Sequence, residues 1–418
     1  MSRDESSANQ ADNDGSHTEQ RQPHGQGNDT ARHESAGHEI AEHYRTRIVS
    51  SLSEIGQAVW DELVGLQADA NPFLSFAFLD ALHESGSAAA QSGWQPQFVT
   101  LWRDKQLMAA MPLYAKGHSY GEYVFDWAWA DAYERNGLRY YPKLLSAIPF
   151  TPVTGGRLLA RDETSREALI RTLQALQSAN DFSSTHILYP PQAQAQQLHD
   201  AGFLLRSGVQ FHWLNPGYRR FDDFLDTLER KKRKNIRAER RKVHDADVRF
   251  RHISGHQATE ADWQFFKRCY DNTYAAHRST PYLNLDFFLR IGATMPQNIL
   301  LIVAEREGQA IASSLVIHDG KTLYGRYWGA LTHIDCLHFE TAYYQPLEFC
   351  IANGLRCFEG GAQGEHKMAR GFLPQQTWSA HWLAHPGFAH AIEDFLTRET
   401  GGILAYIDEL NEHNPFKR

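Results

Sequence analysis

The chain has 418 residues, and at this length two domains are a better expectation than a single core. Hydrophobic residues make up 42% and aromatic residues 12%, enough for sizeable cores, while a formal net charge of -8 argues against a protein that coats nucleic acid. The four cysteines form no CxxC pair and no metal-type spacing with histidine, so the sequence predicts neither a disulfide scaffold nor a metal site.

The N-terminal segment, residues 1–45, consists of small, polar and charged residues with scattered alanine. It can bury too little apolar area to offset the entropy lost on ordering, so it is predicted to be a disordered tail. Its histidines are irregularly spaced, which favours a solvated tail over a metal site. The tail has no apolar stretch typical of a signal peptide, and no later run is long enough to span a bilayer. We expect a cytoplasmic protein, with peripheral membrane contact left open.

The rest of the chain carries the same residue pattern twice. Four segments recur in the same order at a nearly constant shift of 201 to 209 residues. They are 72–79 and 281–288, 98–110 and 301–313, 123–127 and 324–328, and 140–148 and 343–351. Such an order indicates a duplicated domain. The predicted domains are residues 46–213 and 214–418.

Each copy predicts the same elements in chain order, and the fold class is α/β. A helix with an aromatic face is followed by a hairpin of two strands, a third strand, a second helix and a last strand. In the first copy these are 73–82, 98–103, 107–114, 122–125, 140–147 and 153–159. In the second copy they are 282–291, 300–306, 310–318, 322–327, 343–352 and 357–360.

This order of elements resembles the GNAT acyltransferase fold. Two such units in tandem resemble the Fem-type ligases, which add amino acids from aminoacyl-tRNA to cell-wall precursors. The segments HSYGEYVFDWAWADAYERNGLRYYPKLL, FTPVTG, RKKRKNIRAERRKV and GAQGEHKMARGFLP are similar to a bacterial Fem-like family of GNAT-type N-acyltransferases or peptidoglycan-biosynthesis-like proteins. The resemblance runs from about residue 51 to the C-terminus. It implies two tandem GNAT-like domains and transfer of an acyl or aminoacyl group to an amine.

A strongly basic stretch, residues 230–242, opens the second copy with nine Lys or Arg and one acid, so the rest of the chain sums to -16. On a helix, Leu225, Leu228, Ile236 and Val243 fall on one stripe, and the basic residues cover the other sides. Charges of one sign repel one another unless an anion neutralises them. We therefore predict that this face binds an anionic partner, in preference to the alternative that it only contacts water. tRNA phosphates, a nucleotide diphosphate and lipid headgroups are the candidates, and no DNA partner is expected.

The resemblance adds residue roles to this stretch, because Fem-type ligases carry a comparable basic element there. It implies that Arg233, Lys234, Asn235 and Arg237 bind substrate.

The loop after the last strand of the second copy is the main candidate for chemistry. Four glycines in residues 360–371 allow close backbone approach, and charged side chains crowd the same loop. Ligands bind beyond the strand ends of open α/β sheets, and the corresponding first-copy stretch has lost the charges. We predict Lys367, His366 and Glu359 as catalytic and Gln363 and Arg370 as substrate-binding, against a structural turn whose charges pair with one another. In the resembling enzymes a Lys followed by Gly-Phe holds substrate here.

A third candidate segment carries acidic and cationic side chains among aromatic residues. Asp126, in the first copy, is a candidate general base, although alternating aromatic residues also fit a plain core. In the second copy Arg326 is placed to meet an anion, beside Tyr327 and Trp328. Substrate contact is predicted for Arg326, Tyr327 and Trp328, together with Tyr120 and Lys143.

The acyl donor stays open at this point. Enzymes of the GNAT fold that use acyl-CoA hold its pyrophosphate with a glycine-containing loop at a helix N-terminus, whereas residues 331–340 contain no glycine. This favours aminoacyl-tRNA over acyl-CoA as donor, acting on a small-molecule or cell-wall-precursor amine. A CoA-dependent N-acetyltransferase and a non-catalytic protein that binds an anion or a membrane surface are the alternatives.

Overall fold

The computed structural model describes residues 44–361 and 364–417. The predicted disordered tail lies outside the described residues except for its last two, and Gln363 lies outside them as well. None of the described helices combines the length and the apolar character needed to cross a bilayer.

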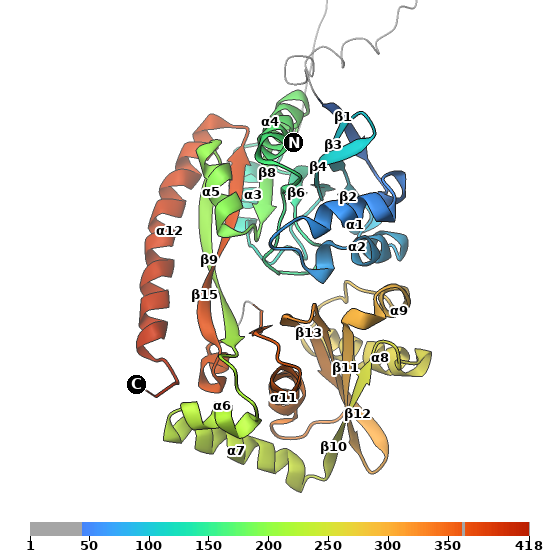
Figure 1. The fold of residues 1–418 in the computed structure, drawn as a ribbon. Coiled ribbons are helices and arrows are strands. Elements are labelled where there is room, and N and C mark those ends of the chain that lie inside the picture. Colours follow the sequence, from blue (N-terminus) through green and yellow to red (C-terminus); the bar gives the residue numbers. More distant parts are fainter. Residues whose placement is uncertain (1–43, 362–363, 418) are drawn as a thin grey trace, which may run out of the picture.

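The described residues form a mixed α/β structure built on two sheets, which confirms the predicted fold class (Figure 1). The smaller sheet has the strand order β1 (Arg45–Val49), β3 (Phe98–Arg103), β4 (Gln106–Met111) and β7 (Leu159–Ala160). The larger sheet has the order β10 (Val248–Ser254), β11 (Ile299–Arg306), β12 (Gln309–His318), β13 (Thr322–Ala330), β14 (Cys357–Glu359), β9 (Leu204–Leu214), β15 (Leu373–Leu383), β8 (Ser184–Leu188), β6 (Lys143–Ser146), β5 (Tyr114–Lys116) and β2 (Trp94–Pro96).

The helices cover the faces of these sheets. They are α1 (Gln57–Gly65), α2 (Phe76–Glu84), α3 (Trp127–Arg135), α4 (Glu163–Ala179), α5 (Gln192–Asp200), α6 (Phe221–Thr227), α7 (Arg230–Asp245), α8 (Glu260–Ala276), α9 (Leu285–Thr294), α10 (Leu337–Phe339), α11 (Gln345–Ala352) and α12 (Pro386–Glu412). We call the elements from β1 to α5 the first lobe and those from α6 to β14 the second lobe. In Figure 1, β9, β15 and α12 run alongside both lobes.

The two lobes exchange strands through β9 and β15. The end of β9, which follows the first lobe in sequence, pairs with β14 of the second lobe. The end of β15, which follows the second lobe, pairs with β8 of the first lobe. The two long strands also pair with each other from Leu373↔His212 to His381↔Leu204. One continuous sheet therefore joins the lobes, an arrangement that the sequence did not predict.

The hairpins of the two lobes carry the same irregularities, as a duplication requires. The register shifts between Leu101 and Trp102 in the β3–β4 pair and between Ala304 and Glu305 in the β11–β12 pair. The following turns each have a non-glycine residue with a φ of 53°. These features are separated by the 203 residues that relate the two hairpin sequences.

The helices that precede the hairpins also correspond and pack against each other. Ser75 caps α2 and Asn284 caps α9 by accepting a backbone N–H bond. Phe78 of α2 meets its own counterpart, Phe287 of α9, edge to face at a centroid distance of 5.6 Å. Contact between equivalent residues is what a two-fold relation produces. One hydrophobic core therefore spans the interface between the lobes.

The second half of the first copy differs from the prediction. Residues 122–125 form no strand, residues 140–147 contain β6 instead of a helix, and most of 153–159 is irregular. Helix α3 follows directly after residues 122–125, in a stretch for which no element was predicted. The aromatic residues that matched Tyr324 and Tyr343 therefore lie in different elements, because the first lobe has α3 and its flanking loop between β5 and β6. The predicted segment 343–352 does hold helical structure, a π-helical turn running into α11.

The basic stretch forms α7, and its predicted apolar seam is buried. Leu225, Leu228, Ile236 and Val243 are each at most 2% exposed. They do not lie on one helix, however, since α6 ends at Thr227 and Leu228 has extended backbone. Two helices that share one seam therefore replace the single predicted helix.

Candidate active site between strands β13 and β14

An opening separates β13 from β14 at the centre of the second lobe. The two strands are parallel and pair only from Thr322↔Cys357 to Tyr324↔Glu359. Beyond Glu359 the chain turns away at Gly360, whereas β13 continues beside β12 after a register shift at Leu315/Val316. The space left is about 100 Å³ in volume. Its lining is Ser314, Leu315, Val316, Gly325, Arg326, Tyr327, Trp328, His338, Ala342, Tyr343, Phe358 and Gly360.

Glu359 lies at the edge of this opening, between two of its lining residues. Burial raises the pKa of its carboxyl to about 8, although the positive charge of Arg326 lowers it. The buried Oε2 atom has no hydrogen-bond partner among the described residues. A buried carboxyl of this kind exchanges a proton near neutral pH and has a free oxygen with which to do so.

Arg326 lies on β13 at the rim of the opening and reaches the first lobe. Its guanidinium donates a hydrogen bond of 2.8 Å to the carbonyl of Phe150, which also accepts one of 3.0 Å from the Tyr327 hydroxyl. The Arg326 Nε–H is buried and has no partner among the described residues. Trp328 forms an aromatic wall, stacked on His338 with ring centroids 4.4 Å apart. Of the predicted residues, Arg326, Tyr327 and Trp328 line the opening, and Glu359 lies at its edge, where its charge interacts with that of Arg326.

The loop after β14 folds back over its own glycines. Lys367 is 5% exposed, and its ammonium donates to the carbonyls of Gly360 at 2.5 Å and Gly361 at 3.3 Å. Burial lowers the Lys367 pKa to about 8. His366 is hydrogen-bonded to the Tyr343 hydroxyl at 3.2 Å. Lys367 therefore holds the strand end in place and does not point into open space.

Arg370 was predicted to bind substrate, but its donor groups are engaged within the protein. It donates to both Glu239 carboxylate oxygens, to the Tyr344 hydroxyl and to the His366 carbonyl. Its guanidinium lies 3.5 Å from the Phe339 ring centroid. The geometry gives Arg370 a positioning role, in which it ties the loop to α7.

The equivalent position of the first lobe is closed. There, β6 and β8 form the parallel pair, with Ser146↔Ile187 as the last partners. Arg157 is fully buried, and its guanidinium caps the carbonyls of Leu188, Gly155 and Val153 at 2.7 to 2.9 Å. Counted from the last strand pair, Leu188 corresponds to Gly360, whose carbonyl Lys367 caps. The larger Arg157 side chain therefore fills the position that corresponds to the opening of the second lobe.

Asp126 and Lys143 lie in a buried charge cluster of the first lobe. The Lys143 ammonium, 0% exposed, donates to Ser119 at 2.8 Å, Glu122 at 2.8 Å and Asp126 at 2.5 Å. Burial alone would raise the Asp126 pKa, but the adjacent Lys143 holds it below its ordinary value. Neither side chain is exposed enough to touch substrate, and the prediction that Asp126 is the general base finds no support in this geometry.

The cluster continues into a histidine pair that joins the first lobe to β15. The two Nδ1 atoms of His186 and His381 are 2.7 Å apart, in directly paired strands. Tyr140 bridges the cluster, since its hydroxyl donates to Asp126 at 2.6 Å and lies 3.2 Å from His186 Nε2. Burial lowers the pKa of His186 to about 3 and that of His381 well below its ordinary value.

This pair predicts loss of stability in acid. The folded protein keeps both imidazoles neutral, whereas the unfolded chain protonates them near pH 6.5. Their contribution is therefore complete above pH 6.5 and falls by up to about 1.4 kcal/mol per pH unit for each histidine below it. We expect His381→Gln to flatten the decline of the unfolding free energy between pH 6 and 4, as measured by urea titration. His333→Gln, which changes an exposed imidazole, is the control, and equal slopes for the wild type and His381→Gln would contradict the prediction.

The other predicted substrate-binding residues lie away from the opening. Tyr120 is 58% exposed on a first-lobe loop, edge to face with Trp127. Lys234 and Asn235 are exposed on α7, where Arg233 and Arg237 form ion pairs with Asp226 and Asp222, both at 3.1 Å. None of them lines the opening.

The sequence analysis missed three residues that shape the site. Tyr343 and His338 form walls of the opening, and Arg157 closes its first-lobe counterpart. Tyr343 appeared in the repeat, yet it was matched to Tyr140, which lies in a different element. A lone Arg157 in an irregular segment carried no signal at all.

Comparison with known proteins places this fold. A family model described as FemAB-like, peptidoglycan biosynthesis/recognition, matches residues 51–418. No curated protein matches the chain.

Among solved structures, FemX has a TM-score of 0.53 at 11% sequence identity, covering 84% of this chain and 100% of FemX. L-PGS from Bacillus licheniformis has a TM-score of 0.49 at 11% identity, covering 81% and 95%. A tandem GNAT protein from the clavulanic acid pathway has a TM-score of 0.42 at 10% identity, covering 82% and 99%. The likeness to FemX shows a shared fold. With the family model matching nearly all of the described residues, this chain belongs to the FemAB-like family.

Proposed function

We propose that the protein transfers an acyl group, preferably an aminoacyl group, to an amine at the opening between β13 and β14. One observation carries this proposal. Arg326 lines the opening and Glu359 lies at its edge, and each of these two oppositely charged residues keeps a buried polar atom without a partner among the described residues. A base for an ammonium and a donor for a carbonyl oxygen are the two groups that amide formation needs.

The reaction follows from these positions. The Glu359 carboxylate takes a proton from the acceptor ammonium, and the free amine attacks the donor carbonyl carbon. Arg326 Nε–H donates to the oxyanion that forms. The bond from the carbonyl carbon to the leaving oxygen or sulfur then breaks as the amide forms. Glu359 returns its proton to the leaving atom, and the second nitrogen proton goes to solvent.

The size of the opening limits the acyl group. The opening holds about 100 Å³, less than the cavity of about 150 Å³ that benzene fills, so it favours a small acyl group. The glycine-free stretch 331–340 lacks the loop that would hold a pyrophosphate, which favours an aminoacyl-tRNA over acyl-CoA as donor. The family description supports an amine of a cell-wall precursor as acceptor.

The test is a single-turnover transfer assay on the full chain. The donors supplied are tRNAs charged with small amino acids and CoA thioesters of small acyl groups. The acceptors are nucleotide-linked cell-wall precursors. Amide formation from an aminoacyl-tRNA is the expected result. Transfer from acyl-CoA alone would reassign the donor, and binding without transfer from either donor class would contradict the proposed activity.

Filling the opening should block the donor. Ala342 lines it from the helical segment before α11, so Ala342→Leu places three extra carbon atoms in about 100 Å³. We expect at least a tenfold loss of kcat/KM with little change in the melting temperature, because the added atoms enter empty space. Ala352→Leu, the same change at the exposed end of α11, is the control. Equal losses in the two variants would place the acyl group elsewhere.

A further inference from the structure

One residue of the first lobe, Phe150, is in direct contact with the rim of the opening in the second lobe. Its carbonyl oxygen accepts a hydrogen bond of 2.8 Å from the Arg326 guanidinium and one of 3.0 Å from the Tyr327 hydroxyl. Among the described residues, the other hydrogen-bond acceptor of Arg326 is the Tyr327 hydroxyl, at the longer distance of 3.4 Å. The Phe150 carbonyl is therefore the main polar contact that holds the guanidinium in place.

The backbone of Phe150 has a conformation that a bulky residue rarely adopts. Its φ is 57°, in the left-handed region that favours glycine, although its side chain is buried and only 2% exposed. Such a conformation persists only where the surrounding structure enforces it, and it occurs preferentially at functional sites. Because this conformation sets the direction of the carbonyl, its consequence is felt at Arg326.

Contacts from both lobes enforce the conformation of Phe150. Its ring stacks on Tyr282 of the second lobe, with ring centroids 4.8 Å apart and an angle of 12° between the planes. In the first lobe, its backbone N–H donates to the Gly121 carbonyl at 3.2 Å. A Cβ atom at Gly121 would lie 2.5 Å from the Phe150 ring, so the glycine leaves room for it. Phe150 is thus held by its ring, its N–H and its carbonyl.

The buried charge cluster of the first lobe fixes the loop that carries Gly121. The Lys143 ammonium donates to Ser119 and Glu122, which lie on either side of Gly121 in the sequence. The side chains of Lys143 and Glu122 are at most 1% exposed. None of these residues lines the opening. The cluster therefore supports the opening indirectly, through this loop and Phe150.

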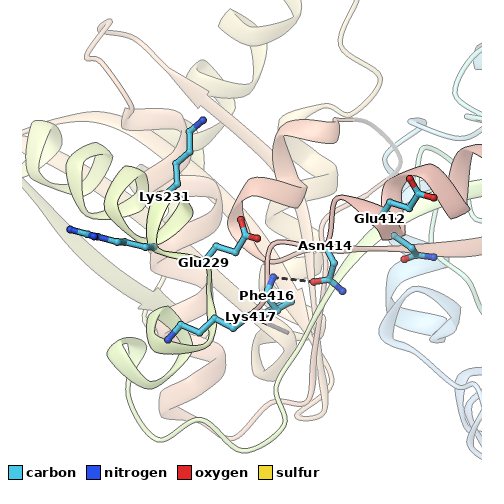
Figure 2. A pocket seen from close by; sticks show the side chains of 8 residues that line it. Glu229, Lys231, Glu412, Asn414, Phe416 and Lys417 are labelled. Atoms are coloured by element: carbon cyan, nitrogen blue, oxygen red, sulfur yellow. Dashed lines mark hydrogen bonds between the residues drawn. The ribbon is translucent and has the colours of Figure 1, made fainter.

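A hollow of about 950 Å³ lies where the first turn of α7 meets the C-terminal segment (Figure 2). Its lining includes Glu229, Asn414 and Lys417, and the Asn414 side chain accepts a hydrogen bond of 3.0 Å from the Phe416 N–H. None of its lining residues belongs to the first lobe or lines the opening. A substitution there therefore serves as a control for substitutions at Phe150.

We propose that Phe150 is a positioning residue of the candidate active site, whose left-handed backbone directs its carbonyl so that Arg326 is held at the opening. This rests on the proposed function, in which the Arg326 Nε–H donates to the oxyanion. The first lobe then completes the site of the second lobe without contacting the reacting groups.

The pKa of Glu359 reports where Arg326 lies, independently of any transfer reaction. Burial raises this pKa, the positive charge of Arg326 lowers it, and the negative charge of Asp319 raises it. The Lys367 ammonium, bonded to the adjacent Gly360 carbonyl, is the same in every variant below. If the guanidinium moves away, the Glu359 pKa should rise further. Three other titratable groups beside Glu359 stay neutral, since burial lowers the pKa of the imidazole and raises those of the phenol and the thiol; they are His212, Tyr324 and Cys357.

The experiment compares Phe150→Ile with Phe150→Leu in the full chain. The two side chains are isomers and both lack the ring, but β-branched isoleucine disfavours the left-handed conformation more strongly. The Glu359 pKa is measured by NMR titration of protein with isotope-labelled glutamate carboxyls, and Glu359→Gln assigns the signal. We expect a higher Glu359 pKa in Phe150→Ile than in Phe150→Leu, together with single-turnover transfer that is slower by about 10- to 100-fold.

A third variant, Phe150→Gly, separates the direction of the backbone from the packing of the ring. Glycine adopts a positive φ without strain but leaves the largest void. Phe150→Gly should therefore have the lowest melting temperature of the three variants, yet a Glu359 pKa and a transfer rate closer to the wild type than those of Phe150→Ile. Asn414→Ala, at the hollow of Figure 2, is the control and should change neither quantity.

Two outcomes would overturn the proposal. One is an equal Glu359 pKa and an equal rate in Phe150→Ile and Phe150→Leu. The other is a difference between these variants that persists when Arg326 is replaced by Met, because Phe150 would then act by means other than Arg326. A rise in the Glu359 pKa that is confined to Phe150→Ile supports the positioning role even where no donor is turned over. Failure of the proposed function is thereby distinguished from failure of this inference.

Discussion

Replacing Glu359 by Gln should lower the rate of single-turnover transfer by about 100- to 10,000-fold, the range that a general base contributes. The amide keeps the size of the side chain but cannot accept the ammonium proton. Because burial raises the Glu359 pKa to about 8, the wild-type rate should rise with pH up to about 8, where the carboxylate becomes the main form. That rise should be absent in Glu359→Gln.

Two further variants make this result specific. Glu359→Asp keeps a carboxylate but shortens the side chain by one methylene group, so an intermediate rate is expected. Glu305→Gln makes the same chemical change on β11 of the same lobe, at a carboxylate bonded to Arg251, and should leave the rate unchanged. A Glu359→Gln enzyme with the wild-type rate and pH profile would remove Glu359 from the reaction.

Replacing Lys143 by Met should destabilise the fold by about 3–5 kcal/mol, because it leaves Glu122 and Asp126 buried without their cation. Urea unfolding measures this loss. Lys116→Met is the comparison, since Lys116 is equally buried but forms no ion pair among the described residues; it donates to the Tyr120 carbonyl at 3.3 Å and lies over the Trp94 ring. Burial lowers the Lys116 pKa to about 7, so the folded protein already holds part of it neutral at pH 7. We expect a smaller loss for this variant.

A double variant tests whether the buried carboxylates left without a cation cause this loss of stability. Lys143→Met combined with Asp126→Asn removes one of the stranded charges, so its stability should exceed that of Lys143→Met alone. Strictly additive losses would mean that the ion pair itself contributes little and that packing explains the effect.

The sequence predicted the fold where local patterns determine it. Both hairpins and both aromatic helices were found, because alternation, turn residues and capping residues are local features. The prediction failed after β5, where the first copy contains α3 and its flanking loop and so differs in structure from the second copy. Asp126 looked like a tuned base because its neighbours are aromatic, but its pKa depends on Lys143, which only tertiary folding brings close.

The same distinction between local features and tertiary contacts applies to the residues of the candidate site. Glu359 and Arg326 stood out as charges at the end of one strand and in the middle of its neighbour, and parallel pairing brings the two charges close together, with Arg326 lining the opening and Glu359 at its edge. Lys367 and Arg370 stood out as charges in a glycine-rich loop, yet their partners are the carbonyl of Gly360 and the carboxylate of Glu239. A sequence gives no count of the hydrogen-bond partners that a buried cation meets, so binding and support roles look alike.

The exchange of β9 and β15 constrains how this protein is synthesised. β8 leaves the ribosome with β6 as its only strand partner, and its other edge stays open until β15 emerges about 190 residues later. At about 5–20 residues per second this interval is on the order of 10–40 s. During that time the nascent first lobe exposes an unpaired strand edge, a template for pairing with other chains. Folding before chain release therefore depends on protection of that edge, and ribosomes that stall inside the second lobe should leave aggregation-prone fragments.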